Sequence, residues 1–206
     1  MKLVVLGATG GIGLEIVKQA LERGHSVTAF VRSRERLESF RGRITIVQGD
    51  VLNSAELAKA VEGQDAVLSS LGPRDPRANG RLLQSFAIAL TSAMVHSSIR
   101  RVLVVSVAFL FKDSIIPPAY LVGRLFFAHH VADASAMEDI LRKSGLDWTI
   151  VRPPQLSNRP RTGAYRVREG HLPRFGFTIS RADVADFMIQ AVENHASSRK
   201  IVGVCN

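Results

Sequence analysis

Cysteines, membrane-length apolar segments and signal-peptide features are scarce or missing in this sequence. The one cysteine among 206 residues is Cys205, so no internal disulfide can form and a reducing compartment fits the chain. The mainly apolar stretch at residues 102–111 is far shorter than the about 20 residues of a membrane-spanning helix. Four apolar residues stand between Lys2 and the first glycine, too few for the core of a signal peptide. We therefore expect a cytoplasmic protein with no membrane partner.

The chain also lacks internal repeats, low-complexity segments and linkers, which favours a single domain over residues 1–206. A chain of this length buries about 70% of the surface that it exposes when unfolded. The net charge is +9, from 27 Lys and Arg against 18 Asp and Glu, and such a surplus attracts phosphate groups. No RNP-type aromatic motif, zinc-finger spacing or long basic run accompanies it, so nucleic-acid binding is not favoured. No Cys, Asp or Glu cluster joins the histidines, so the sequence indicates no metal site.

Segments typical of strands and helices alternate along the first 150 residues. Apolar runs of strand length stand at residues 2–7, 25–31, 43–49, 65–72, 101–107 and 147–151. Residues 12–23, 54–61, 81–97 and part of 119–143 have helical spacing, and Asn53 with Glu56 forms a capping-box pattern. Continuous apolar strands between amphipathic helices predict an α/β fold, doubly wound, with a mainly parallel sheet and helices on both faces. The tail adds a hairpin-like segment at 162–170, a helix at 181–194 capped by Ser180, and a last strand at 200–204.

Gly7, Gly10 and Gly13 in the stretch VVLGATGGIG fall between the first expected strand and the first expected helix. There they allow a tight turn, close approach of the backbone to a pyrophosphate, and close packing of helix on strand. The helix N-terminus presents free N–H groups and its positive dipole end to phosphate oxygens. A glycine-rich turn without a ligand is the alternative, but strand, turn and helix all fall where the motif needs them. We therefore predict a dinucleotide at this turn.

The end of the second expected strand indicates which dinucleotide. NAD sites place Asp or Glu there for the ribose 2′-hydroxyl, whereas NADP sites place Arg nearby for the 2′-phosphate. The stretch FVRSRER supplies Arg32, Ser33, Arg34 and Arg36, and its one acid, Glu35, lies inside the basic run. A guanidinium can bind a phosphate through two hydrogen bonds, whereas a carboxylate would repel it. A solvated basic loop would explain some of these arginines but not the missing acid, so the sequence favours NADPH.

Two later strand ends complete the predicted cofactor crevice. Asp50 and Val51 follow the third strand and are placed to touch adenine, although Asp50 could equally begin the turn before helix 54–61. Gly72 and Arg74 follow the fourth strand, where the chain passes the pyrophosphate. Arg74 has a plain surface position as its alternative.

The order and spacing of GATGGIG, VRSRERL, GDVL, GQDAVLSSLG, SGLDWTIVRPP, TGAYRV and ISRADVADFM resemble one family over nearly the whole chain. It is the NAD(P)H-binding (NmrA-like) group of atypical short-chain dehydrogenases, whose best-known member type is the flavin reductase/biliverdin-IXβ reductase. The resemblance implies a Rossmann-like sheet, NADPH, and hydride transfer to flat acceptors such as flavins or linear tetrapyrroles. The cofactor contacts that it implies are Gly7, Thr9, Gly10, Gly11, Ile12, Arg32, Arg36, Asp50, Val51, Leu71, Gly72 and Arg74.

The chain departs from that family at the loops expected beside the nicotinamide. Where the reductase has Thr-Ser-Ala-Phe-Leu, this chain has SVAFL, so Ser106 matches the Thr and Val107 replaces the active-site Ser. Where the reductase has Pro-Pro-His, Gln155 stands in place of the His, after Pro153 and a second proline. We expect Ser106, Val107, Pro153 and Gln155 to contact the cofactor. These differences put biliverdin in doubt as the natural substrate more than they do a flavin.

Three residues are candidates for catalysis: Ser106, Tyr120 and His130. Tyr120 and Arg124 in PPAYLVGR have the spacing of the Tyr-Lys pair of ordinary short-chain dehydrogenases, and Ser106 precedes Tyr120 by 14 residues. A nearby cation lowers a tyrosine pKa, but the arginine fork differs from a lysine ammonium, and Tyr120 could simply pack at the rim of the pocket. His129 and His130 follow on the expected helix, and one of them could donate a proton. The alternative is one partly buried and one exposed histidine.

These observations predict an NADPH-dependent oxidoreductase that transfers hydride to a flat small-molecule acceptor such as a flavin, quinone or tetrapyrrole. Only 55 residues follow Val151, too few for the large substrate lobe of epimerase-like relatives, which favours an open pocket. The alternative from another class is a non-catalytic NAD(P)H-binding sensor that regulates a partner through cofactor occupancy. A basic nucleic-acid-binding accessory protein is a third reading. The sequence leaves a monomer and a dimer open.

Overall fold

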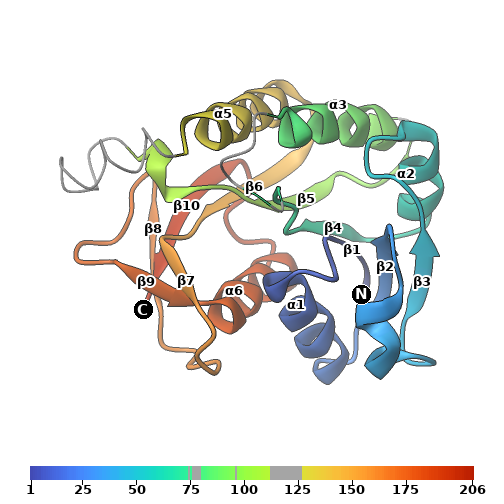
Figure 1. Ribbon diagram of the computed structural model, residues 1–206, viewed down its shortest axis with the longest axis horizontal. Helices are drawn as coiled ribbons and strands as arrows, with labels where there is room; N and C mark the ends of the chain where they lie inside the picture. Colours follow the sequence, from blue (N-terminus) through green and yellow to red (C-terminus); the bar gives the residue numbers. More distant parts are fainter. Residues whose placement is uncertain (74, 76–79, 96, 112–126) are drawn as a thin grey trace.

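The central feature of the computed structural model, which describes residues 1–73, 75, 80–95, 97–111 and 127–206, is an eight-stranded sheet (Figure 1). Its strands are β1 (Lys2–Leu6), β2 (Ser26–Val31), β3 (Thr45–Gln48), β4 (Ala66–Ser69), β5 (Arg101–Val105), β6 (Asp147–Arg152), β8 (Arg166–Glu169) and β10 (Lys200–Cys205). They lie in the order β3-β2-β1-β4-β5-β6-β10-β8, and all neighbours are parallel except β10 and β8. The first six strands have the Rossmann order. The chain adds strands toward one edge of the sheet from β1 to β3 and toward the other edge from β4 onward, so the switch point lies between β1 and β4.

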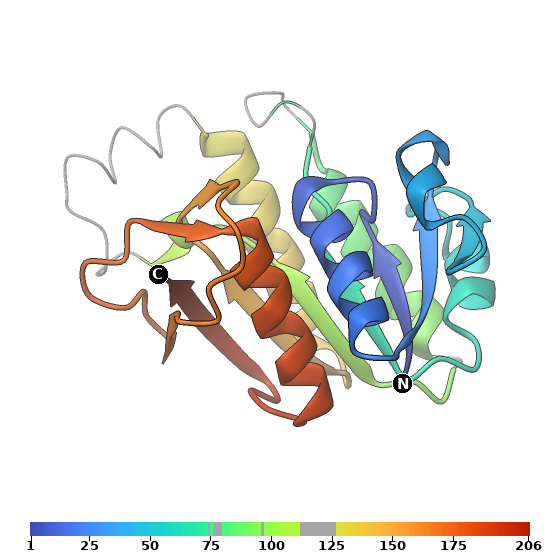
Figure 2. The same cartoon turned by 90° about the horizontal axis from the view of Figure 1, so that it is seen from below.

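Helices cover both faces of this sheet (Figures 1 and 2). On one face lie α1 (Gly11–Glu22) and α6 (Arg181–Glu193), and on the other lie α2 (Ser54–Val61), α3 (Leu82–Val95) and α5 (Ala128–Lys143). Strand β1 shows why its sequence is continuously apolar: Leu3 and Val5 pack toward α1 and α6, whereas Val4 and Leu6 pack toward the other three helices. Side chains alternate across a strand, so a strand that is covered on both faces is apolar at consecutive positions. The predicted doubly wound α/β fold is confirmed.

The predicted elements recur with small shifts at their ends, and two predictions need correction. The segment 162–170 is not a hairpin: it contributes one strand, β8, which pairs antiparallel with β10 at the edge of the sheet. The capping box at α2 is only half formed. Asn53 Oδ1 accepts from the backbone N–H groups of Ala55 (3.1 Å) and Glu56 (3.3 Å), as predicted. The Glu56 carboxylate, however, accepts from the backbone N–H of Asp50 (2.8 Å), so it closes the turn after β3.

Four short elements were not predicted from the sequence. Strands β7 (Gln155–Ser157) and β9 (Thr178–Ser180) form a separate two-stranded parallel sheet beside the main one. The 3-10 helix η1 (Glu35–Phe40) follows β2, and the 3-10 helix η2 (Ala108–Leu110) follows β5. Leu37 in η1 is completely buried against the α1 and α6 core, so it anchors the basic segment that precedes it. Of the helix expected within 119–143, the structure describes α5, and residues 119–126 lie outside the described part of the chain.

Candidate functional site

The turn between β1 and α1 is built on glycines that no other residue can replace without strain. Gly7 has φ +77°, in the left-handed region that L side chains rarely adopt, and a Cβ there would lie 3.0 Å from the Ser70 backbone. A Cβ on Gly13 would lie 2.1 Å from the Gly7 carbonyl oxygen, so α1 packs on the turn more closely than any side chain permits. The Gly10 N–H donates to the Gly7 carbonyl (2.9 Å) and closes the turn. The geometry is the one that the glycine motif predicts.

The N-terminus of α1 begins at this turn and is open to an anion. Its N-cap residue, Gly10, provides no side-chain cap, and the first turn of the helix contains no acidic residue. Gly11 is exposed and Thr9 is half-buried, whereas Ile12 is buried in the core, so Ile12 offers only its backbone to a ligand. The helix N-terminus carries free N–H groups and a partial positive charge. It also lies where the strand order reverses, the position at which open α/β sheets bind ligands.

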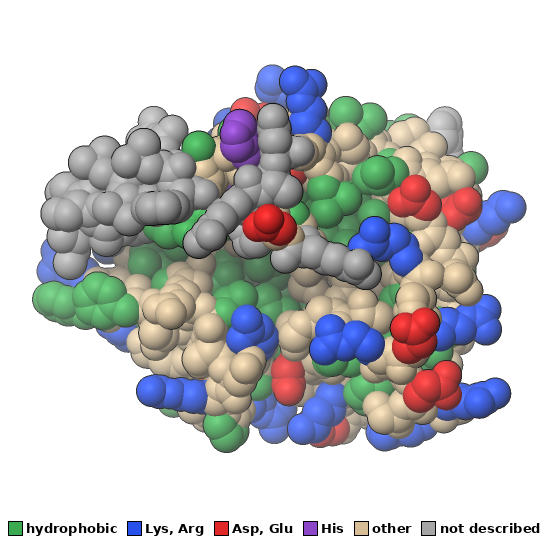
Figure 3. Space-filling model, viewed as in Figure 1, with side chains coloured by type: hydrophobic (Ala, Val, Ile, Leu, Met, Phe, Trp, Pro, Cys, Tyr) green, Lys and Arg blue, Asp and Glu red, His purple; other side chains and the backbone are tan. Residues whose placement is uncertain are grey.

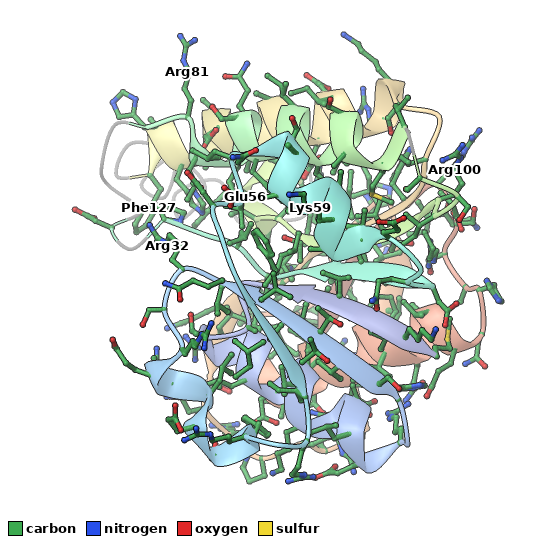
Figure 4. The ribbon with its side chains drawn as sticks, turned by 90° about the vertical axis from the view of Figure 1, so that its right-hand side faces the viewer. Arg32, Glu56, Lys59, Arg81, Arg100 and Phe127 are labelled. Carbon is green, nitrogen blue, oxygen red and sulfur yellow. The ribbon has the colours of Figure 1, made fainter. Side chains whose placement is uncertain are left out.

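An open hollow of about 600 Å³ lies beside the carboxyl end of β2. It is lined by Arg32, Ser33, Arg34, Glu35, Glu38 and Gln48. Arg32 is the first residue past β2 (Figure 4). Gln48 Nε2 donates to the Arg32 carbonyl (3.0 Å), so β3 fixes the backbone of the arginine run. Arg36 is exposed on η1 and is not among the lining residues, whereas Arg34 is. Of the two lining acids, Glu38 pairs with Arg41 (3.7 Å).

The predicted contacts after β3 and β4 lie at the same edge of the sheet. Asp50 Oδ1 accepts from the Leu52 N–H (3.0 Å), so this exposed residue shapes the turn before α2, the second of its two expected roles. Val51 is buried under the α2 and α3 core. Leu71 is half-buried against that core and Gly72 is exposed. Arg74 lies outside the described residues.

Ser106 belongs to a buried polar cluster that the sequence did not predict. It lies just after β5, and its hydroxyl donates to the Glu138 carboxylate of α5 (2.5 Å). The same carboxylate accepts from Arg152 Nε (2.9 Å) and Arg152 Nη2 (2.5 Å), at the end of β6. Ser106 is 6%, Glu138 2% and Arg152 8% exposed. The Arg152 guanidinium also lies over the Phe111 ring, 4.6 Å from its centroid. Because the Ser106 hydroxyl already donates its hydrogen bond to Glu138, the serine can only accept a hydrogen bond from a ligand.

The other predicted nicotinamide contacts lie in the segments that follow β5 and β6. Val107 is half-buried and packs against the α2, α3 and α5 core. Pro153 is buried directly after β6, and Gln155 is exposed at the start of β7, where its backbone N–H donates to the Phe177 carbonyl (3.2 Å). Neighbouring parallel strands bring their carboxyl ends to one edge, so these loops lie together on that edge.

His130 lies in the first turn of α5, half-buried, while its neighbour His129 is exposed, which agrees with the alternative reading of the pair. Its Nδ1 is buried and has no hydrogen-bond partner among the described residues. Burial lowers the pKa of His130 below its usual value, and the nearby Asp133 carboxylate only partly opposes this. The Asp133 oxygens accept from the Leu83 N–H (2.9 Å) and the Gln84 N–H (2.8 Å), so they cap α3 rather than pair with the histidine. The other proposed donor, Tyr120, lies outside the described residues, as does Arg124.

Sequence reasoning also missed two residues on the α6 side of the site. Arg181 lies across Gly11, and Asp183 joins α6 to the loop at 162–163. Asp183 Oδ1 accepts from the N–H groups of Thr162 (2.8 Å) and Gly163 (3.0 Å). Burial alone would raise the pKa of Asp183, but hydrogen bonds from Asn206, Gly163, Thr162 and Ser180 outweigh it and hold that pKa below its usual value. Asp183 lies three residues after the N-cap Ser180, and this spacing is the sequence signal that could have identified its role at the start of α6.

Two further observations concern the described residues as a whole. No group of three or more His, Cys, Asp or Glu among them could hold a metal ion, and none of the helices described is long and apolar enough to cross a membrane. Basic side chains are scattered among polar ones on the face in Figure 3, instead of forming one continuous patch. Such scatter resembles the small groups of arginines seen in the sequence.

Comparison with known proteins agrees with this geometry. A family model described as NAD(P)H-binding matches residues 7–195. An uncharacterised chloroplastic protein of Arabidopsis thaliana is 34% identical over 214 residues, covering 98% of this chain and 76% of that protein. The NADP complex of a short-chain dehydrogenase/reductase from Veillonella parvula has TM-score 0.84 at 22% identity, covering 100% of this chain and 94% of that one. A candidate NADH-flavin reductase from Streptococcus pneumoniae has TM-score 0.78 at 24% identity, covering 100% and 99%. At these identities the two structures show the Rossmann fold alone.

Proposed function

This chain belongs to the NAD(P)H-binding family, and from that premise we propose that it is an NADPH-dependent oxidoreductase that reduces a flat acceptor such as a flavin, quinone or tetrapyrrole. The observation that carries the proposal is the glycine turn at the switch point, with an uncapped helix N-terminus beside it. When bound, NADPH would supply the hydride, and the protein would supply binding, orientation and electrostatics.

The residues present fit such a cofactor at both ends. The turn at Gly7 and Gly13 leaves the backbone bare where a pyrophosphate must approach, and the α1 N-terminus favours its charge. The loops after β5 and β6 carry Val107, Pro153 and Gln155, which we propose as contacts for the nicotinamide end. Ser106 would accept a hydrogen bond from the nicotinamide amide group, because its hydroxyl already donates a hydrogen bond to Glu138.

The choice of NADPH over NADH rests on the hollow at the end of β2. Arg32 and Arg34 line it, and no acid occupies the two positions directly after β2, where a ribose-binding carboxylate would stand. Two guanidinium groups favour a 2′-phosphate through charge and paired donors. Glu35 and Glu38 line the same hollow, and Glu38 is turned toward Arg41.

The proposed acceptor follows from the proton chemistry of the described site. Ser106 donates to a carboxylate and Gln155 has no titratable proton, so neither serves as a general acid. A flavin or quinone needs no protein acid, because water can protonate it after hydride arrives. The solved candidate NADH-flavin reductase matches this chain over nearly the whole length of both proteins, and its name supports the same class of acceptor. Tyr120 and His130 stay proposed as proton donors for acceptors that need one.

The test is to mix the purified protein with NADPH and follow the reduced nicotinamide absorbance with FMN, a quinone or biliverdin. We expect FMN- or quinone-dependent consumption of NADPH that exceeds consumption of NADH. Retention of turnover by Tyr120→Phe would make the tyrosine a residue of the pocket rim. Tight NADPH binding without consumption of any acceptor would refute the reductase and support a cofactor-binding sensor.

We further infer that the protein works in a reducing compartment, with the cytoplasm as the proposed location. Its cysteine, Cys205, is buried, and burial raises the pKa of this thiol, which keeps it in the unreactive form. Imaging of the tagged full-length chain tests the location. Accumulation in another compartment would contradict it.

A further inference from the structure

Arg181, the first residue of α6, extends its side chain to the N-terminus of α1. A Cβ on Gly11 would lie 2.5 Å from Arg181 Cδ and 2.8 Å from its Nε. The arginine stem therefore occupies the space that any other residue at position 11 would fill. The missing side chain at Gly11 gives a cation room at the phosphate-binding turn.

The start of α6 lies toward the same end of the molecule as the start of α1 (Figure 2). Gln19 Nε2 donates to the Ala182 carbonyl (2.9 Å), and Arg23 Nη2 pairs with Asp186 Oδ1 (2.5 Å). Both contacts join residues that are 163 positions apart, so the two helices run parallel. The backbone of Arg181 is thus held by packed helices at the carboxyl edge of the sheet.

The charges at this point are unbalanced among the described residues. The first turn of α1 has no acid and no side-chain cap, so its partial positive charge is not offset. Arg181 brings a full positive charge to the same place, and within the described part of the chain its Nη1 donates only to the neutral amide oxygen of Asn158 (2.7 Å). No carboxylate of the described chain forms an ion pair with it. By contrast, Arg23, at the other end of α1, pairs with both Asp186 and Glu193.

The acid in the first turn of α6 is held by other groups of the described chain. Asp183 lies in the first turn of α6, but Ser180, Thr162, Gly163 and Asn206 donate to its oxygens. A helix N-terminus and a guanidinium repel each other unless an anion lies between them. The arrangement is therefore suited to a ligand that brings negative charge to Gly11.

We propose that Arg181 binds the pyrophosphate of the dinucleotide, opposite the backbone N–H groups of α1, and that Asn158 orients its guanidinium. This inference rests on the proposed function and deepens it. A guanidinium has five donors, so the bond to Asn158 leaves donors for two phosphate oxygens. The pyrophosphate is common to NADPH and NADH, whereas the Arg32 hollow addresses the 2′-phosphate. Arg181 therefore contributes to affinity for both cofactors equally.

The test measures dissociation constants for NADPH and NADH by calorimetry, using wild type, Arg181→Gln, Arg181→Lys and the control Arg142→Gln. Arg142 is half-exposed on α5, across the sheet, and its loss changes the net charge by the same amount. We expect Arg181→Gln to weaken both cofactors by about tenfold to a hundredfold, the loss for a charge-assisted hydrogen bond. Arg181→Lys should recover part of the affinity, and Arg142→Gln should bind as wild type does.

Three results would overturn the assignment of Arg181 alone, and a fourth would overturn it together with the proposed function. Binding of both cofactors by Arg181→Gln within twofold of wild type would make Arg181 a surface residue, while the proposed function would stand. A loss of affinity for NADPH with unchanged affinity for NADH would show that Arg181 contacts the 2′-phosphate instead of the pyrophosphate. A lowered melting temperature with unchanged affinities would show a purely structural role. Failure of wild type to bind either cofactor would instead refute the proposed function, together with this inference.

Discussion

The buried Glu138–Arg152 pair should dominate the stability of the sheet edge that carries the proposed nicotinamide site. Replacing Glu138 by Leu removes the acceptor for three hydrogen bonds and leaves a guanidinium, 8% exposed, without a counter-charge. Breaking such a pair by removing one partner costs about 3–5 kcal/mol. For a chain of this size, each kcal/mol lowers the melting temperature by about 2–4 °C, so we expect a drop of roughly 6–20 °C.

The double variant separates the charge from the packing. Arg152→Met alone should cost a similar amount, because it leaves the Glu138 carboxylate buried and also removes the contact with Phe111. Glu138→Leu with Arg152→Met removes both charges together. It should be more stable than either single variant, since apolar pairs of similar volume replace buried ion pairs at little cost.

Urea unfolding of the four proteins measures these free energies, and a double-mutant cycle gives the coupling. The matched control is Asp139→Ala on the same helix, because Asp139 pairs with Arg142 at 3.4 Å where both side chains are about half-exposed. That change should cost less than about 1 kcal/mol. Single variants at Glu138 or Arg152 that cost no more than the control, or a double variant equal to their sum, would refute the reasoning.

Two further predictions concern acid stability and the glycine turn. Asp183 has a lowered pKa, so its stabilising contribution is present above its unfolded value near 3.8 and is lost as pH falls through the folded value. Asp183→Asn should therefore flatten the loss of stability in acid, and an unchanged pH profile of urea unfolding would contradict this. Gly13→Ala should cost about 3 kcal/mol or more and abolish NADPH binding, because the Cβ meets the Gly7 carbonyl at 2.1 Å. Gly145→Ala, with open space around it, is the control for that change.

The sequence predicts the sheet and the glycine turn because both are encoded locally. The interior positions of the central strands are mostly apolar, and the first of the three glycines follows β1 directly, so neither feature depends on a distant partner. The position of the arginine run that begins at Arg32 was predicted for the same reason. Local spacing fixes where β2 ends and which residues follow it.

Features that need a partner from elsewhere in the chain escaped prediction. Glu138 reads as one polar position on an amphipathic helix, and only the fold brings it to Ser106 and Arg152. The stretch around Arg166 has a strand-like alternation, but the sequence cannot say that it pairs with β10 instead of folding back on itself. The Glu56 carboxylate could accept from the backbone N–H of Asn53 or from that of Asp50. The tight turn after β3 brings the Asp50 N–H to the carboxylate, so Asp50 is the donor.

The most direct test of the account is calorimetric titration of the wild-type protein with NADPH and with NADH. We predict that both bind and that NADPH binds at least about tenfold more tightly, as expected for charge-assisted bonds to the 2′-phosphate. Arg32→Gln should remove most of that difference and leave the affinity for NADH unchanged. Equal affinity for the two cofactors would contradict the assignment of the arginine hollow, and the absence of binding to either would contradict the central claim.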